Sequence, residues 1–134
     1  MSAETNKQAV LDMHKAIGRG DIDGMFTPMT EDVTFRVTGD HALGQRVYQG
    51  KEDIVNNLLM TIFGRLDGGV EVNIISMAAE DDKVFLHFTG KAKTREGAPY
   101  NNEYVQLFSF RDGKISGVVE FLDTALLARV LGGG

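Results

Sequence analysis

One acidic residue of the sequence has the surroundings of a proton-transfer group. Glu120 is the charged member of the otherwise apolar run 118–122. A carboxyl group enclosed by apolar side chains has a raised pKa, and it can then act as a general acid or base near neutral pH. The other interpretation is that Glu120 pairs with an arginine or accepts hydrogen bonds at a dimer interface. The direction of the side chain decides between them.

Hydrogen-bonding side chains alternate around Tyr104. Asn102, Tyr104 and Gln106 are spaced two residues apart, and alternate residues of a strand share one face. Such a face can orient a carbonyl or hydroxyl group of a ligand, with Tyr104 as the donor to a developing oxyanion. The alternative is that Tyr104 packs in the core with its hydroxyl group at the edge.

Metal and thiol chemistry find no support in the sequence. The histidines, His14, His41 and His87, share no metal-ligand spacing with one another or with an acid. We expect His14 to be a structural residue near the cavity mouth, and strand alternation directs His87 away from the pocket. The chain has no cysteine, which excludes disulfides and thiolate sites. We therefore expect neither a metal nor another cofactor.

The composition is that of one ordinary domain. The chain has 134 residues, of which 43% are hydrophobic and 25% charged, so we expect a single domain over 1–134 with a flexible glycine tail at 132–134. A net charge of -5 lacks the basic surplus that nucleic-acid binding needs. Apolar runs such as 58–63 are too short for a membrane span, and the polar start does not match a secretory signal. The expected location is the cytoplasm.

The sequence predicts that helices come first along the chain and that most of the strands follow. We expect a capping box at residues 5–8, a short helix capped by Asp21, and a last helix capped by Asp123 or Thr124. Glycines at 90 and 117 are expected to bend the sheet. The result is an α+β fold in which a curved mixed or antiparallel sheet wraps around N-terminal helices and encloses a pocket. The predicted long helices are 5–19 and 51–64, and the short last helix is 125–131. The predicted strands are 33–37, 70–77, 83–93, 101–111 and 114–122, and 39–50 is a loop or short hairpin.

The turn at Asp112 and Gly113 sets the direction of Glu120. A two-residue hairpin places Glu120 opposite Val105, on the face away from Gln106. A three-residue loop with a bulge places it opposite Tyr104, on the face of Gln106. Under the second interpretation the other face of this hairpin is also apolar and needs a partner, which predicts a homodimer. The residues on that other face are Val105, Leu107, Val119 and Phe121.

The order of these elements resembles the nuclear transport factor 2-like superfamily, in its SnoaL-like and ketosteroid isomerase-like branch, over essentially the whole chain. Four segments carry the resemblance: GRGDIDGM, EDVTFRV with the following GKEDI, KTREGAPYNNEY, and FRDGKISGVVEFLDT. The resemblance implies a cone-like fold with a mostly apolar pocket and a dimer through the outer face of the sheet. It favours the interpretation in which Glu120 faces the pocket.

The resemblance also shows which known chemistries the sequence lacks. At the positions of the ketosteroid isomerase tyrosine, aspartate base and protonated acid, this chain has Met13, Val37 and Gln106. At the limonene epoxide hydrolase arginine and aspartate it has Phe88 and Gly90, and the final acid alone is matched, by Glu120. Neither of these two mechanisms is expected.

The expected function is binding of a small apolar, oxygen-bearing molecule of polyketide, steroid or terpenoid size. If the protein is an enzyme, we expect cofactor-independent isomerisation, cyclisation or dehydration in which Glu120 moves the proton. The alternative is a non-catalytic ligand-binding or association domain, which a cavity filled by Phe35, Phe88 and Phe108 would favour. Besides Glu120 and Tyr104, the predicted pocket residues are Met13, His14, Phe35, Val37, Leu58, Ile62, Phe88, Asn102, Gln106, Phe108 and Val118.

Overall fold

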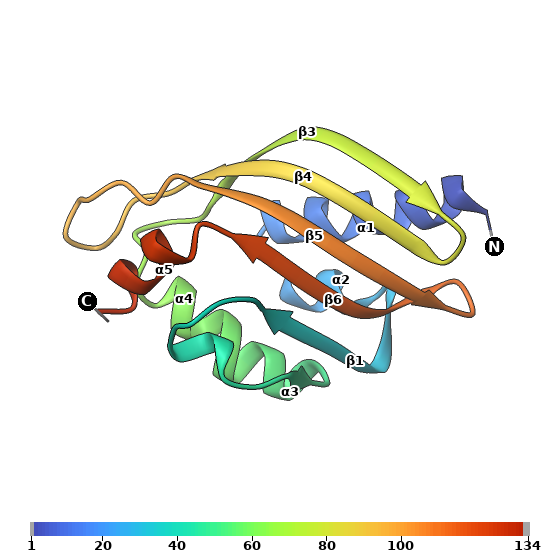
Figure 1. The fold of residues 1–134 in the computed structure, drawn as a ribbon, viewed down its shortest axis with the longest axis horizontal. Helices are drawn as coiled ribbons and strands as arrows, with labels where there is room; N and C mark the ends of the chain where they lie inside the picture. The colour runs from blue at the N-terminus through green and yellow to red at the C-terminus, as the bar shows by residue number, and fades with distance from the viewer. Residues whose placement is uncertain (1, 133–134) are drawn as a thin grey trace.

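The computed structural model describes residues 2–132 and shows one six-stranded sheet with the helices along one of its faces (Figure 1). The strand order is β2-β1-β6-β5-β4-β3. The sheet is open, with β2 and β3 at its edges. The strands are β1 (Met29–Val37), β2 (Tyr48–Gln49), β3 (Glu71–Glu80), β4 (Lys83–Lys91), β5 (Asn102–Arg111) and β6 (Lys114–Leu122). The helical segments are α1 (Ala3–Gly18), α2 (Ile22–Phe26), η1 (Ala42–Gly44), α3 (Lys51–Asp53), η2 (Ile54–Leu59), α4 (Met60–Phe63) and α5 (Thr124–Val130).

The sheet is mixed because its first long strand lies beside its last. β3 to β6 form the antiparallel meander that the alternating pattern predicts. β1 pairs with β6 in parallel, with Val37 opposite Glu120. The α+β fold class is therefore confirmed, and β1 is longer at its start than the predicted strand.

The helix caps agree with the sequence at two of three positions. Asp21 accepts a hydrogen bond from Gly24 N at 2.8 Å, as predicted, and Asp123 rather than Thr124 caps α5. The prediction for α1 is wrong, because the helix begins earlier: Ser2 is the cap and accepts from Thr5 N at 3.1 Å. Thr5 returns the contact by accepting from Ser2 N.

The predicted helix 51–64 contains a wider turn. It runs from α3 through η2 into α4, and η2 is π-helical. Ile54 and Leu58 of this wider turn are buried, so the helix still presents an apolar stripe to the sheet. No helix within residues 2–132 is long and apolar enough to cross a membrane.

The β5–β6 hairpin combines features of both predicted interpretations. Asp112 and Gly113 have φ of 52° and 79°, and Arg111 pairs with Lys114, so the turn has two residues. The register then shifts by one residue next to Ser116, and Gln106 pairs with Glu120. Both predicted partners of Glu120 are therefore wrong. The face predicted by the three-residue interpretation is correct, because the bulge supplies the extra residue that the turn does not.

Candidate active site

A cavity of about 120 Å³ lies between the concave face of the sheet and the helices. Its wall is almost entirely apolar. The strands β1, β5 and β6 contribute side chains from alternate positions, and β3 and β4 contribute one side chain each. Of the residues that the sequence suggested for the pocket, those in the wall are Met13, His14, Phe35, Val37, Leu58, Ile62, Phe88, Tyr104, Gln106 and Glu120.

Three residues suggested for the pocket lie outside its wall. Phe108 and Val118 are paired across β5 and β6 and are fully packed in the core beyond the cavity. Asn102 points to the end of β6, where its Nδ2 donates to Asp123 O at 3.2 Å and its Oδ1 accepts from Asp123 N at 3.1 Å. Nδ2 also donates to the Tyr100 hydroxyl at 3.1 Å, and Oδ1 also accepts from Glu103 N at 2.7 Å. Asn102 therefore joins the start of β5 to the cap of α5, and its amide has no donor or acceptor left for a ligand.

The wall also includes residues that the sequence reasoning missed. Tyr100 precedes β5 and continues the alternation of Tyr104 and Gln106, which is the signal that could have found it. Leu43 in η1 and Leu127 in α5 close the cavity from segments whose direction only the tertiary structure sets. Tyr100 matters most, because it adds a second phenol group to the wall.

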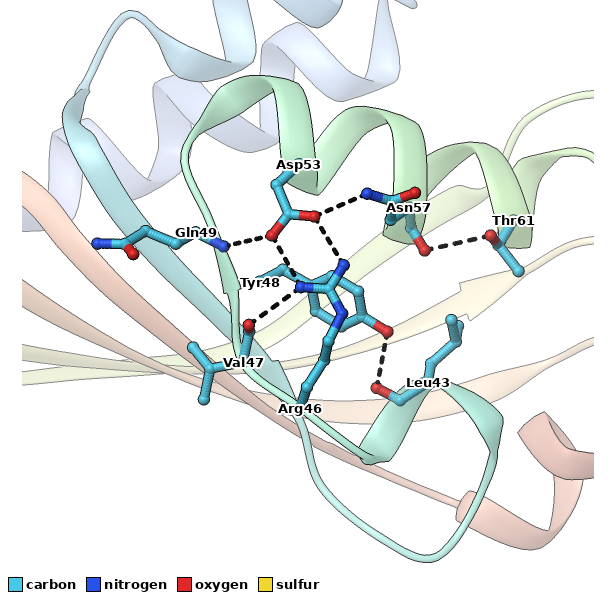
Figure 2. A network of polar contacts seen from close by, with 8 residues as sticks. All are labelled: Leu43, Arg46, Val47, Tyr48, Gln49, Asp53, Asn57 and Thr61. Carbon is cyan, nitrogen blue, oxygen red and sulfur yellow. Dashed lines mark hydrogen bonds and ion pairs between the residues drawn. The ribbon is translucent and has the colours of Figure 1, made fainter.

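The loop that carries Leu43 is fixed by a polar network (Figure 2). Arg46 forms a two-pronged ion pair with Asp53, with N–O distances of 2.7 and 2.9 Å, and its guanidinium stacks 4.1 Å from the centre of the Tyr48 ring. Asp53 also accepts from Gln49 N and Asn57 Nδ2. The Arg46 hydrogen bonds, with those of Asn57 and Gln49, hold the pKa of Asp53 well below its usual range. The network keeps the loop against the start of the long helix.

A chain of hydrogen bonds ends on Glu120. Gln106 Nε2 donates to Glu120 Oε1 at 2.6 Å. The other amide atom, Gln106 Oε1, lies 2.9 Å from His14 Nε2 and can only accept, so His14 carries its proton on Nε2 and donates. The chain therefore runs from His14 through Gln106 to one oxygen of Glu120. Oε2 of Glu120 receives no hydrogen bond from residues 2–132, and Glu120 lines the cavity.

The pKa values of the residues in this chain of hydrogen bonds suit acid–base chemistry. Burial raises the pKa of Glu120 to about 7, and the hydrogen bond from Gln106 opposes part of that rise. Burial lowers the pKa of His14, so His14 is neutral at pH 7. His14 Nδ1 is buried without a hydrogen-bond partner in the described chain, which a neutral ring tolerates better than a charged one. Glu120 is thus the group that changes charge near neutral pH.

Two tyrosines complete the polar part of the wall. The Tyr104 ring stacks on Phe88 with centroids 4.7 Å apart. Burial raises the pKa of Tyr104, and the nearby Tyr100 and Glu120 raise it further. The pKa of Tyr100 is also raised, mainly by burial. Both phenols keep their protons over the usual pH range and serve as hydrogen-bond donors beside an ionisable carboxyl group.

His41 and His87 lie away from this group. His87 is on the convex face of the sheet, where it contacts Glu103 at 2.6 Å. His41 holds its own loop through Thr38 O and Leu43 N. Within residues 2–132, no three His, Asp or Glu side chains are arranged to hold a metal ion.

Comparison with known families assigns the chain. The family model of the SnoaL-like domain matches residues 10–118, most of the sequence. The chain belongs to the SnoaL-like domain family. The search of curated proteins gave no significant match to this SnoaL-like chain.

Solved structures confirm the nuclear transport factor 2-like fold. An NTF2-like protein of unknown function from Burkholderia pseudomallei has a TM-score of 0.84 at 17% identity, with 98% of both chains covered. TerC co-crystallised with polyporic acid has a TM-score of 0.83 at 22% identity, covering 96% of this chain and 99% of TerC. A proposed SnoaL-like polyketide cyclase from Jannaschia sp. has a TM-score of 0.81 at 17% identity, covering 98% and 94%. At these identities the likeness establishes the fold of this SnoaL-like domain.

Proposed function

We propose that this protein binds a small apolar, oxygen-bearing molecule in the cavity and catalyses a cofactor-independent proton transfer, of the isomerase, cyclase or dehydratase type. The observation that carries the proposal is the Glu120 carboxyl group in a mostly apolar cavity wall, beside Tyr100 and Tyr104, where burial raises its pKa to about 7. Such a pKa keeps a useful fraction of Glu120 ionised as a base, and of its conjugate acid as a proton donor, at neutral pH.

The proposed step begins with a carbonyl compound in the cavity. Glu120 Oε2 removes a proton from the carbon next to the carbonyl group, and the C–H electron pair moves to form an enolate. Tyr100 or Tyr104 donates a hydrogen bond to the enolate oxygen. Glu120 then returns the proton to another carbon. Alternatively, the enolate carbon attacks a second carbonyl carbon within the same molecule, and Glu120 gives its proton to the alkoxide oxygen that forms. No electron acceptor is needed for either outcome.

Gln106 and His14 act as positioning residues in this proposal. The Gln106 amide holds Glu120 Oε1, which leaves Oε2 free to act on a ligand. His14 holds the amide in the orientation that donates to Glu120, because its Nε2 proton needs the amide oxygen as acceptor. Replacing Gln106 with Leu removes a donor that stabilises the carboxylate, so the pKa of Glu120 should rise further.

The position of Glu120 in the fold suits a residue that acts as the general base. Val37 stands at the position matched with the ketosteroid isomerase base, and Glu120 lies opposite Val37 on the neighbouring strand. We propose that the acid has the same task from the adjacent strand. The similarity to a proposed polyketide cyclase is consistent with this class of chemistry.

The cavity size limits the substrate. A cavity of about 120 Å³ is slightly smaller than the ~150 Å³ space that holds a benzene molecule. We propose a ligand of about one ring, or a larger polyketide, steroid or terpenoid that enters by moving side chains such as Phe35 and Phe88. The first probes should therefore be monocyclic ketones and lactones.

The test measures proton abstraction directly. Candidate ketones are first selected by thermal shift, because a ligand that binds the folded state raises the melting temperature. Exchange of the hydrogens next to the carbonyl group is then followed by proton NMR in D₂O. We expect wild type to accelerate the exchange and Glu120→Gln to lose about a hundredfold or more of that rate.

The matched control is Glu103→Gln, since Glu103 is an acid of the same sheet on the convex face. It should exchange at the wild-type rate. Unchanged exchange in Glu120→Gln would overturn the proposal. Ligand binding without exchange in wild type would instead support the non-catalytic ligand-binding alternative.

A further inference from the structure

A second concave site is lined by α4, α5 and the connection between β4 and β5. These segments lie at the same end of the molecule (Figure 1). It is a surface groove of about 720 Å³. It is separate from the cavity: Ile62 and Leu127 face the cavity, whereas Thr61 and Leu126, their neighbours in sequence, line the groove. The volume is within the range of small-molecule sites.

Three arginines from three different segments line this groove. Arg65 follows α4, Arg95 lies in the connection before β5, and Arg129 is in the last turn of α5. Of the four arginines elsewhere in the chain, three pair with an aspartate: Arg19, Arg46 and Arg111. The three groove arginines have no carboxylate within 4.0 Å among residues 2–132.

Main-chain carbonyl groups hold two of these arginines in place. Arg95 Nε donates to Gly64 O at 2.7 Å, and Arg65 Nη1 donates to Val130 O at 3.1 Å. These are bonds to neutral acceptors, so the positive charges stay uncompensated. Each guanidinium also keeps further N–H groups that no described residue engages, and their directions are restricted by the bonds already made.

The charge of the groove is opposite to that of the whole protein. Three arginines and one acid, Glu96, give a local excess of two positive charges in a chain with a net charge of -5. Like charges that line one groove without a counterion repel one another, and a bound anion reduces that repulsion. The net charge of the chain opposes binding of nucleic acid, which points to a small anion.

We propose that this groove is a binding site for the phosphate group of a small molecule. A phosphate monoester carries close to two negative charges at pH 7, which matches the local excess. Its several oxygens accept from guanidinium groups that approach from different segments, and arginine is suited to such two-pronged contacts. A single carboxylate has one charge and leaves part of the excess uncompensated. The inference is independent of the proton-transfer function.

The test uses inorganic phosphate, pyrophosphate and glycerol phosphate as probes, titrated into the full chain by calorimetry. We expect saturable one-to-one binding with at least one of them, weakened about tenfold or more by Arg129→Gln and by Arg95→Gln. Arg111→Gln is the matched control, because this exposed arginine lies elsewhere and pairs with Asp32. It should leave binding unchanged.

Two further arms keep the result interpretable. Arg95→Lys retains the charge, so circular dichroism and binding of this variant separate loss of the anion site from loss of the contact with Gly64 O. Vesicles containing phosphatidic acid, compared with glycerol phosphate, show whether the phosphate is best presented by a lipid or in solution. No saturable binding of any phosphate, or equal weakening by Arg111→Gln, would overturn the proposal.

Discussion

Gln106 and Glu120 lie directly opposite each other on β5 and β6, with the amide nitrogen 2.6 Å from the carboxylate. This pairing exists because β6 contains one residue more than the regular ladder needs, next to Ser116. Without the bulge, the two-residue turn would place Glu120 opposite Val105, on the convex face. A single irregular residue therefore determines whether the cavity contains an acid.

Glu120 should make the stability of the protein depend on pH. Its folded-state pKa is raised to about 7 from 4.5, so the folded state holds the proton more tightly than the unfolded state. The stability that proton binding by Glu120 contributes is fully present below the unfolded pKa, and it is lost as the pH rises through the folded pKa. Glu120→Gln should therefore be more stable than wild type by about 3 kcal/mol near pH 8.5, with little difference near pH 4.5. Urea denaturation at both pH values measures this.

The same comparison removes the effect of His14, whose lowered pKa acts equally in both proteins. Equal stability of the two proteins at all pH values would show that the Glu120 carboxylate is fully solvated and is no candidate for a base of raised pKa.

Gly90 should not tolerate a larger residue. A Cβ atom at this position would lie 2.7 Å from Val70 Cγ1 and 3.2 Å from Tyr104 Cε1, both in the cavity wall. We expect Gly90→Ala to lower the free energy of unfolding by about 1–3 kcal/mol. Gly69→Ala is the control, since a Cβ atom there would meet no atom within 4 Å beyond its chain neighbours. Chemical denaturation that shows equal effects for both variants would contradict the close approach of Val70.

The network around Asp53 should stabilise the protein only while Asp53 is charged. Asp53→Asn weakens the ion pair with Arg46 and should lower the melting temperature at neutral pH. A carboxyl group whose pKa is lowered on folding stabilises the folded state at pH values above its unfolded pKa, and this stabilisation is lost as the pH falls. The difference in melting temperature between Asp53→Asn and wild type should therefore shrink in acid. Thermal melts of Asp67→Asn give the control, because Asp67 is exposed and its contact with Lys93 is long, at 3.9 Å. A difference that persists unchanged in acid would contradict this role.

The convex face of the sheet should form a homodimer. Phe121 and Val105 are opposite each other and remain 45% and 37% exposed, and Phe85 nearby is also exposed, while the helices lie on the other face. A second copy can cover this patch with the same patch across a two-fold axis. Light scattering after size exclusion should give twice the chain mass for wild type and the chain mass for Phe121→Lys. Val47→Lys, at an equally exposed site elsewhere, should remain dimeric. A monomeric wild type would refute the expectation.

Local patterns predicted the strands and most helix ends, since alternation and capping depend on neighbouring residues. Local patterns could not predict contacts between residues that are far apart in the sequence. His14 and Gln106 are 92 residues apart, and no local signal shows that their side chains meet. The register shift near Ser116 also involves contacts with a distant strand. Gly117 lies in the β6 segment that pairs with β1, and a Cβ atom at Gly117 would lie 3.1 Å from Thr34 Oγ1.

The parallel contact between β1 and β6 also affects how the molecule can be made. Thr38 donates to Glu120 O from a position 82 residues earlier in the chain, through both its amide and its hydroxyl group. During translation, β1 therefore cannot pair with β6 until the whole meander has been synthesised. Contacts of such long sequence separation slow folding. We therefore expect the edge of β1 that pairs with β6 to keep its backbone N–H and C=O groups unpaired until β6 is synthesised. A chaperone would help most during this interval.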